Sequence, residues 1–188
     1  MSRNEGSRVC PVERAGGLES RLRTLLQNPH KILAPYIKQD MKVLDIGCGP
    51  GVFSIEMANM VGPSGHVISA DLQEGMLQRL GHKIVGTGLE KIIELRKVEQ
   101  NRIGISDKVD FVLAFYMVHE VPVQMDFFKE VRTVMKNGGN LLIVEPKIHV
   151  SRKDFDQMLE SLASIGFEVL EYPKVFFSRS VLLKNANQ

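Results

Sequence analysis

The chain contains the stretch Lys42-Val43-Leu44-Asp45-Ile46-Gly47-Cys48-Gly49-Pro50-Gly51, in which an apolar run with one acidic residue leads into three alternating glycines. The residues that follow, Val52-Phe53-Ser54-Ile55-Glu56-Met57-Ala58, have the pattern of a helix. A strand, a glycine turn and a helix start in this order are typical of a loop that binds a nucleotide. Glycine has no Cβ, so a ligand can lie against the backbone and face the N–H groups of the helix's first turn.

Downstream of this loop, short apolar runs alternate with helical patterns. We predict strands at residues 43–46, 66–70 (ending in Asp71), 92–98, 109–115 and 141–144, and helices at residues 52–61, 74–85, 123–136 and 152–165. The triplet Asn137-Gly138-Gly139 is predicted to stop the third of these helices just before the fifth strand. Such an alternation is typical of a parallel sheet with helices on both faces.

The C-terminal part of the sequence has a different pattern. Two β runs, at residues 167–172 and 175–183, are separated only by Pro173-Lys174. A connection this short cannot be a helical crossover, so the two runs are predicted to pair antiparallel. The predicted fold is therefore an α/β domain, a doubly wound, mostly parallel seven-stranded sheet with a C-terminal antiparallel hairpin, over residues 40–188.

Residues 1–39 precede this domain core and are expected to belong to the same domain. Residues 1–17 have no periodic apolar pattern and are predicted to form either a mobile arm or a segment that becomes ordered over another part of the protein. Apolar side chains at helical spacing predict a short helix at residues 18–27, and Pro29 can begin a second one that extends to Ile37. These two helices either pack on one side of the sheet or form a lid over the ligand site.

Length, charge and cysteine content restrict the function classes. The 188 residues favour a single domain, and a net charge of +2 is too small to indicate a nucleic-acid-binding or membrane-surface protein. No apolar run approaches the ~20 residues that span a bilayer, and the N-terminus lacks a signal-peptide core. Cys10 and Cys48 have no paired spacing, which favours a reducing, cytoplasmic location. The oligomeric state stays open, a homodimer included.

The acidic residue at the end of the second predicted strand indicates a ribose site. In a doubly wound sheet the ligand lies at the carboxyl ends of the strands, beside the first strand. Asp71 follows Gly49 by 22 residues, close to the interval at which an acid reaches ribose hydroxyls. A carboxylate that accepts from both hydroxyls would form charge-assisted hydrogen bonds.

The glycine pattern and its acidic neighbour favour a cationic cofactor. The dinucleotide fingerprint G-x-G-x-x-G places its third glycine at the position that is Val52 in this chain. Asp45 would repel a pyrophosphate, whereas it would attract the ammonium group of a methionine moiety. The charge therefore favours S-adenosylmethionine. An oxidoreductase that uses a nicotinamide dinucleotide, and a cofactor-binding partner protein without catalysis, remain the alternatives.

With these motifs the sequence resembles the class I S-adenosylmethionine-dependent methyltransferases, in the group that includes the quinone C-methyltransferases. The resemblance covers about residues 40–185 and rests on residues 43–51, on Asp71 and on Val134-Met135-Lys136-Asn137-Gly138-Gly139. It implies that S-adenosylmethionine donates a methyl group to an acceptor. The cofactor-binding residues that it implies are Asp45, Gly47, Cys48, Gly49 and Gly51 at the methionine part, Asp71 at the ribose, Leu72, Glu99 and Gln100 at the adenine, and Phe115.

The resemblance also implies that substrate-facing residues follow the fourth strand, where Tyr116 and His119 are the catalytic candidates. His119 could equally orient a short turn before Pro122, and Glu145 and His149 could face the substrate or lie in a solvated loop. A metal site is not expected, because the fourth strand lacks a terminal carboxylate.

The expected acceptor is a small molecule. Motifs typical of DNA methyltransferases are absent after the fourth strand, and the chain has no basic stripe with interleaved aromatic residues for single-stranded nucleic acid.

Overall fold

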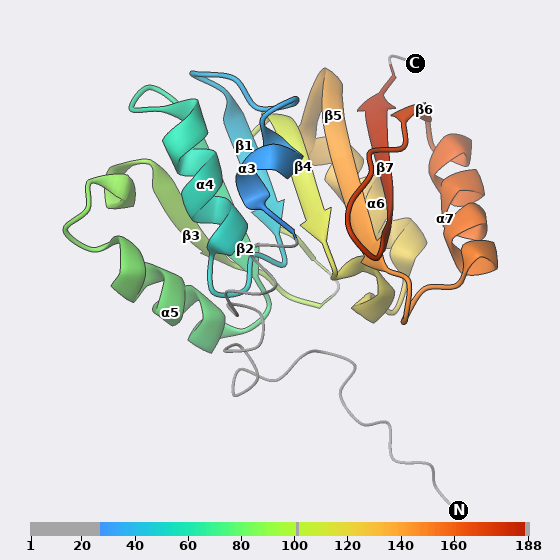
Figure 1. The fold of residues 1–188 in the computed structure, drawn as a ribbon, viewed down its shortest axis with the longest axis horizontal. Helices are drawn as coiled ribbons and strands as arrows, with labels where there is room; N and C mark the ends of the chain where they lie inside the picture. Colours follow the sequence, from blue (N-terminus) through green and yellow to red (C-terminus); the bar gives the residue numbers. More distant parts are fainter. Residues whose placement is uncertain (1–26, 101, 187–188) are drawn as a thin grey trace, which may run out of the picture.

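The computed structural model describes residues 27–100 and 102–186 (Figure 1). The helices are α3 (Pro29–Leu33), α4 (Val52–Val61), α5 (Glu74–Ile84), α6 (Gln124–Val134) and α7 (Arg152–Ser164), with the short 3-10 turns η2 (Leu89–Lys91) and η3 (Val118–Glu120). The strands are β1 (Lys42–Ile46), β2 (His66–Asp71), β3 (Ile93–Lys97), β4 (Val109–Phe115), β5 (Met135–Pro146), β6 (Phe167–Glu171) and β7 (Ser178–Asn185).

These strands form one seven-stranded sheet in the order β3-β2-β1-β4-β5-β7-β6. The first five strands are parallel, while β7 runs antiparallel to both β5 and β6. The sheet is therefore mostly parallel with an antiparallel end, which confirms the fold class predicted from the sequence. The carboxyl ends of β1 to β4 meet at one edge, and β1 lies at the point where the strand order reverses.

The core is divided by the sheet into two layers. Alternate side chains of a strand point to opposite faces, so Val43 packs on one side of β1 and Leu44 on the other. The layer around Val43 contains Met57 of α4 and Leu80 of α5, and Figure 1 shows these helices in front of the sheet. The layer around Leu44 contains buried side chains of α6 and α7. Helices on both faces explain why the strands are apolar on both sides.

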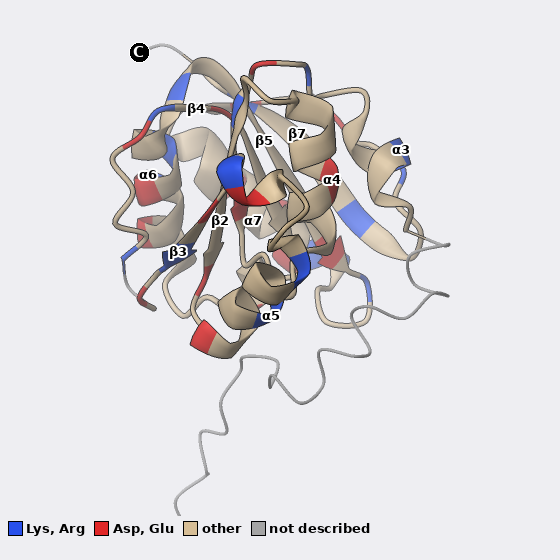
Figure 2. Cartoon of the chain, turned by 90° about the vertical axis from the view of Figure 1, so that its left-hand side faces the viewer, with Lys and Arg blue, Asp and Glu red and all other residues tan. Residues whose placement is uncertain are grey.

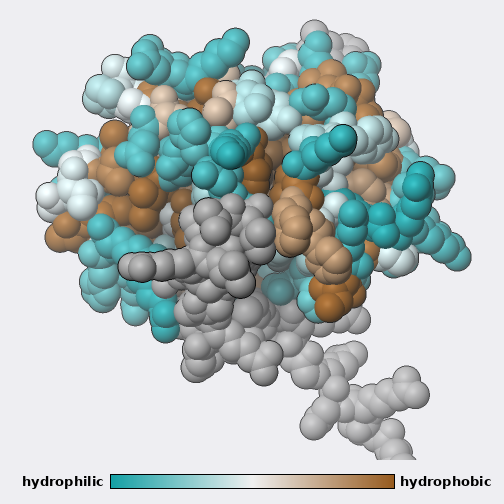
Figure 3. All heavy atoms as spheres, in the orientation of Figure 1, coloured by the Kyte–Doolittle hydropathy of each residue, from teal (hydrophilic) through white to brown (hydrophobic). Residues whose placement is uncertain are grey.

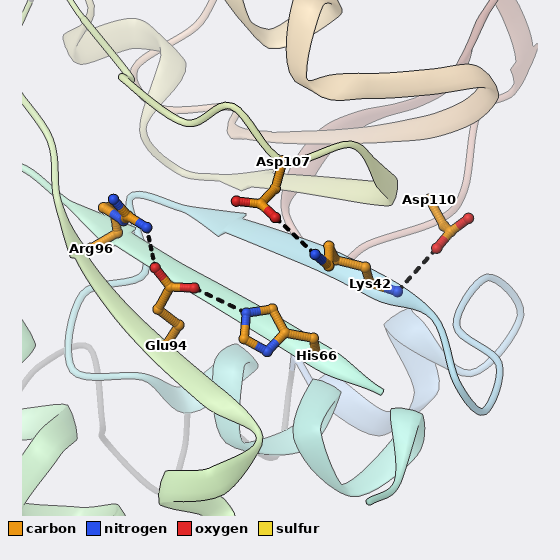
Figure 4. Close-up of polar contacts among 6 residues, drawn as sticks. All are labelled: Lys42, His66, Glu94, Arg96, Asp107 and Asp110. Atoms are coloured by element: carbon orange, nitrogen blue, oxygen red, sulfur yellow. Dashed lines mark hydrogen bonds and ion pairs between the residues drawn. The ribbon is translucent and has the colours of Figure 1, made fainter. Parts of the chain in front are cut away.

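Ion pairs occupy the edge of the sheet at the amino ends of the strands (Figure 4). The ammonium of Lys42 lies 2.8 Å from Asp107, and the backbone N–H of Lys42 donates to Asp110 at 3.0 Å. His66 pairs with Glu94 on the neighbouring strand at 3.0 Å. Partly exposed pairs of this kind contribute about 0–1 kcal/mol each. The edge at the amino ends of the strands therefore carries surface ion pairs, whereas the edge at their carboxyl ends carries the glycine loop.

The boundary between α6 and β5 differs from the prediction. The helix ends at Val134 and β5 begins at Met135, so Asn137-Gly138-Gly139 lies inside the strand and does not stop the helix. Pairing with β4 shifts register between Val109 and Phe111. A Cβ on Gly139 would lie 3.1 Å from the carbonyl oxygen of Asp110, so a larger residue would press this carbonyl and glycine suits the close approach. The glycines belong to an irregularity in the strand pair.

The C-terminal hairpin is confirmed, but its loop is longer than predicted. β7 begins at Ser178, so residues 172–177 form the connection. Phe177 has a φ of 51°, which interrupts the extended conformation predicted from residue 175 onward.

The N-terminal prediction is covered only in part. The second predicted helix is the short α3, which ends at Leu33 and not at Ile37. The predicted arm and the helix at residues 18–27 lie outside the described residues, except for Gln27.

Basic and acidic residues are interspersed along the described elements, as the coloured ribbon in Figure 2 shows for one side of the molecule. In Figure 3, hydrophilic groups surround smaller apolar areas on the face that carries α4. Within residues 27–100 and 102–186, no helix is both long enough and apolar enough to cross a bilayer.

Candidate functional site

A cavity of about 500 Å³ lies at the carboxyl ends of β1 to β4. Its walls are formed by residues 45–50 of the glycine loop, residues 71–73 after β2, residues 98–100 after β3, residues 115–117 after β4, residues 120–123 after η3, and side chains that include Gln27, Phe53, Met76, Arg102, Ile103, Asp126, Phe127 and Glu130. Cavities of this size hold small ligands. The topology therefore brings the glycine loop and Asp71 together, as predicted.

The glycine loop packs tightly against the residue that follows Tyr116. The N–H groups of Gly47 and Cys48 both donate to the carbonyl of Ala70, at 2.8 and 3.0 Å, which ties the loop to β2. A Cβ on Gly47 would lie 2.8 Å from Cγ of Met117. Any side chain at Gly47 would therefore displace Met117 and change the cavity wall.

Asp71 is 6% exposed and holds two backbone groups of the site. Its carboxylate accepts from the N–H of Gly49 at 2.8 Å and from the N–H of Gln73 at 2.8 Å. Burial raises the pKa of Asp71, while these two hydrogen bonds and the charge of Lys97 act in the opposite direction. A carboxylate has capacity for about four hydrogen bonds. Asp71 therefore orders the loop and still has acceptor sites to offer a ligand in the cavity.

Asp45 lies at the floor of the cavity and is 2% exposed. The hydroxyl of Ser54, on the first turn of α4, donates to its carboxylate at 2.6 Å. Burial raises the pKa of Asp45 to about 7; the hydrogen bond from Ser54 lowers it and the nearby charge of Asp71 raises it. An anion in this place is costly unless a cation pairs with it. The electrostatics therefore favour a cationic ligand group beside Asp45.

Aromatic side chains form another wall. The ring of Phe115 lies 4.3 Å from that of Phe53 and 4.5 Å from that of Tyr116, measured between centroids. The hydroxyl of Tyr116 lies 2.6 Å from the hydroxyl of Ser178 and also accepts from the amide of Gln27. Tyr116 has a φ of 59°, a conformation that costs a non-glycine residue free energy. The N–H of Tyr116 donates to the carbonyl of Val144 at 2.8 Å, so contacts distant in sequence hold both the backbone and the side chain of Tyr116.

The remaining predicted contacts lie after β2 and β3. Leu72, Glu99 and Gln100 all line the cavity. Glu99 also forms two backbone hydrogen bonds with Arg102, at 3.0 and 3.2 Å, which close a tight turn beside the cavity. Cys48 lines the cavity as well, and burial raises the pKa of its thiol, so the thiol stays neutral.

Two predicted site residues do not line the cavity. Gly51 is the N-cap of α4, and a Cβ there would lie 2.2 Å from Cδ1 of Leu80, so its role in the structure is packing. His119 points to the end of β5, where its Nδ1 lies 2.5 Å from Glu145. Glu145 is 1% exposed, so it lies neither in a solvated loop nor in the cavity wall.

Several lining residues were not predicted from the sequence. Residues 120–123 follow β4, so their position at the site edge could have been inferred from the topology, as that of Met117 is. Phe127, on α6, is half-buried against the core and also lines the cavity. Gln27 has no sequence signal, because its role depends on contacts with Tyr116 and Phe176.

A family model described as a methyltransferase domain matches residues 37–172, which include the glycine loop, Asp71 and the aromatic wall. The chain belongs to this methyltransferase family. Its fold and its glycine loop make it a class I S-adenosylmethionine-dependent methyltransferase, and its cofactor is S-adenosylmethionine. The resemblance seen in the sequence is confirmed, and the dinucleotide alternative is set aside.

Three known proteins illustrate how this methyltransferase compares with others. It is 34% identical over 110 residues to a demethylmenaquinone methyltransferase of Bacillus cytotoxicus, covering 58% of this chain and 46% of that protein. It is 35% identical over 103 residues to one of Lactobacillus johnsonii, covering 54% and 42%. A solved SAM-dependent methyltransferase from Aquifex aeolicus superposes with a TM-score of 0.85 at 28% identity, covering 95% of this chain and 100% of that one. The methyltransferase thus spans less than half the length of the two curated relatives.

The residues of the cavity fit this cofactor. The acceptor sites of Asp71 and the buried carboxyl of Asp45 match the needs of hydroxyl donors and of an ammonium group. Among residues 27–100 and 102–186, no group of three or more His, Cys, Asp or Glu side chains could hold a metal ion.

Proposed function

We propose that this methyltransferase transfers the methyl group of S-adenosylmethionine to a small-molecule acceptor that lies against the aromatic wall. The observation that supports this proposal is that Phe53, Phe115 and Tyr116 line the same cavity as the glycine loop. Bound S-adenosylmethionine supplies a methyl group on a sulfonium centre. The faces of aromatic rings attract such a cation, and holding the two reactants in line can contribute ~7–11 kcal/mol to catalysis.

The proposed binding roles follow from the position of each residue in the cavity. Asp71 accepts from the ribose hydroxyls, and Asp45 pairs with the ammonium group of the methionine moiety. Leu72, Glu99 and Gln100, which lie after β2 and β3, contact the adenine. Gly47 and Gly49, which line the cavity, contact the cofactor through the loop backbone, with Cys48 as a neutral neighbour.

Tyr116 is the proposed catalytic residue. Its hydroxyl is held by Ser178 and Gln27 at the cavity wall, where it can orient an acceptor and pass a proton to or from it. Because Gln27 precedes β1, we also propose that the segment before the sheet helps to close the cavity. The hydrogen bond from Gln27 to the hydroxyl of Tyr116 is the observation that supports this proposal.

The affinity for S-adenosylhomocysteine is expected to rise with pH through about 7. The pKa of Asp45 is raised to about 7, so its carboxylate is mostly neutral at pH 6 and mostly ionised at pH 8. Ionisation strengthens the attraction to an ammonium group, so the gain approaches about tenfold. Since the folded chain holds the proton of Asp45 more tightly than the unfolded chain, folding stability falls as the pH rises from the ordinary pKa of 3.8 through about 7.

Calorimetric titration with S-adenosylhomocysteine between pH 6 and pH 8 measures this effect. The matched variant Asp45→Asn keeps an oxygen to accept from Ser54 but cannot ionise, so it should bind weakly with a flatter profile. An equally steep profile in Asp45→Asn would assign the titration to another group.

The function itself is tested by transfer of a radiolabelled methyl group from S-adenosylmethionine to panels of small phenols, quinols, amines and carboxylates, with RNA and protein as further acceptors. We expect labelled product in a small-molecule class. Tyr116→Phe should lower turnover by about 10²–10³-fold with little change in S-adenosylhomocysteine affinity. Labelling only of RNA or protein would contradict the proposed acceptor class, and cofactor binding without any transfer would favour the non-catalytic alternative.

A further inference from the structure

A buried carboxylate connects β5 with the turn η3. Glu145 accepts from the N–H of Val118 at 2.9 Å through one oxygen, and its other oxygen lies 2.5 Å from Nδ1 of His119. The carbonyl of Val118 in turn accepts from the side-chain amide of Gln124, on α6, at 3.1 Å. Both backbone polar groups of Val118 are therefore held by side chains, and Val118 itself is 1% exposed.

The residue that precedes this turn and the last residue of the turn both line the cavity. Met117 precedes it and packs against Gly47 of the glycine loop, while Glu120, its last residue, lines the cavity. The N–H of Glu120 donates to the carbonyl of Met117 at 3.0 Å, so the two residues move with the turn. A displacement of Val118 would shift the wall that faces the cofactor.

We propose that His119 and Glu145 form a positioning pair that holds η3, and with it Met117, in the arrangement that binds the cofactor. His119 is not part of the cavity wall, so it acts through Glu145 and not on the acceptor. This proposal rests on the cofactor site proposed above. It assigns a role to two residues that the methyl-transfer chemistry itself does not use.

The strength of the interaction between His119 and Glu145 depends on whether the His119 ring is protonated. Burial acts to lower the pKa of His119, but the hydrogen bond and charge of Glu145 and the charge of Glu120 outweigh it and raise the pKa above the ordinary value of 6.5. The ring of His149 stacks on His119 at 5.2 Å, and Arg179, opposite Glu145 on β7, donates to the carbonyl of Val150 instead.

The sign of the pH dependence follows from the raised pKa. A raised pKa means that the charged pair is complete below the ordinary pKa and is lost as the pH rises through the pKa of the folded protein. If the pair favours the binding form, cofactor binding and protonation of His119 must strengthen each other equally. Asp45 titrates in the opposite direction, so the two effects are separable.

The first measurement is a nuclear magnetic resonance titration of the His119 ring in the full chain, with and without S-adenosylhomocysteine. We expect the midpoint to move up by about 0.5 to 1 pH unit on binding, which corresponds to a three- to tenfold coupling. An unchanged midpoint in a protein that binds S-adenosylhomocysteine would overturn the proposal, because a purely structural role does not couple the two sites.

The second measurement compares S-adenosylhomocysteine affinity of the wild type and His119→Asn from pH 6 to pH 9. The amide of Asn can still donate to Glu145 but carries no charge, so the wild-type advantage at pH 6 should be about three- to tenfold and disappear by pH 9. His30→Asn is the matched control, because His30 pairs with Glu56 at 2.7 Å on the surface and is 66% exposed. A pH-independent ratio, or the same change in His30→Asn, would overturn this proposal alone, whereas absence of binding at every pH would overturn the cofactor site as well.

Discussion

Asp71→Ala is expected to weaken S-adenosylhomocysteine binding by about ten- to a hundredfold. Hydrogen bonds to a charged group contribute about 1.5–3 kcal/mol, which corresponds to this range. The carboxylate has two functions that are lost together: it is the proposed acceptor for the ribose hydroxyls, and it holds the N–H groups of Gly49 and Gln73, each at 2.8 Å. The loss should therefore appear in the affinity and also in a less ordered glycine loop.

Calorimetry of the variant with S-adenosylhomocysteine measures the first effect, and amide hydrogen exchange at residues 47–51 measures the second. Asp107→Ala is the matched control, because Asp107 pairs with Lys42 at the opposite edge of the sheet. Its affinity should equal that of the wild type. If Asp71→Ala binds within about twofold of the wild type, Asp71 does not contact the ribose.

Gly51→Ala is expected to destabilise the fold by about 2–5 kcal/mol. Gly51 has a φ of 84°, and an L-residue in such a left-handed conformation costs about 1–2 kcal/mol. In addition, the new methyl group would lie 2.2 Å from Cδ1 of Leu80, a fully buried side chain, and overpacking of a core costs about 1–3 kcal/mol.

Gly88 supplies a matched control. It is the N-cap of η2 and has a left-handed φ of 89°, like Gly51, but a Cβ there would meet nothing within 4 Å. Gly88→Ala should therefore cost only the conformational part, about 1–2 kcal/mol. Urea unfolding of both variants gives the difference, which measures the displacement of Leu80. Equal losses in the two variants would show that the core accommodates the methyl group freely.

The parts of the fold that could be predicted are those in which neighbouring residues carry the signal. Helix α4 and strand β4 have the predicted bounds, because each is an apolar pattern bounded by polar or glycine residues. The boundary at Asn137-Gly138-Gly139 was wrong because the same triplet suits a helix stop and a strand irregularity. The approach of Gly139 to Asp110 on another strand decides between the two.

In the candidate site, too, the predictable residues are those whose position follows from local sequence patterns. The glycine loop, Asp45 and Asp71 were predictable, because residues at the carboxyl ends of parallel strands share one edge. Gln27 and Ser178 were not, since each reaches Tyr116 from a distant part of the chain. Nor could the sequence place His119 beside Glu145, because the separation of these residues matches no binding motif.

The position of β7 between β5 and β6 has a consequence for folding during synthesis. Six of the seven strands precede β7 in the chain, yet β6 is joined to the sheet only through it. The hydroxyl of Ser178, which supports Tyr116, also arrives with β7. The glycine-loop half of the cavity can therefore assemble early, whereas the wall that contains Tyr116 has to wait until β7 leaves the ribosome. A nascent chain halted before residue 178 should capture the methyl donor before it can act on an acceptor.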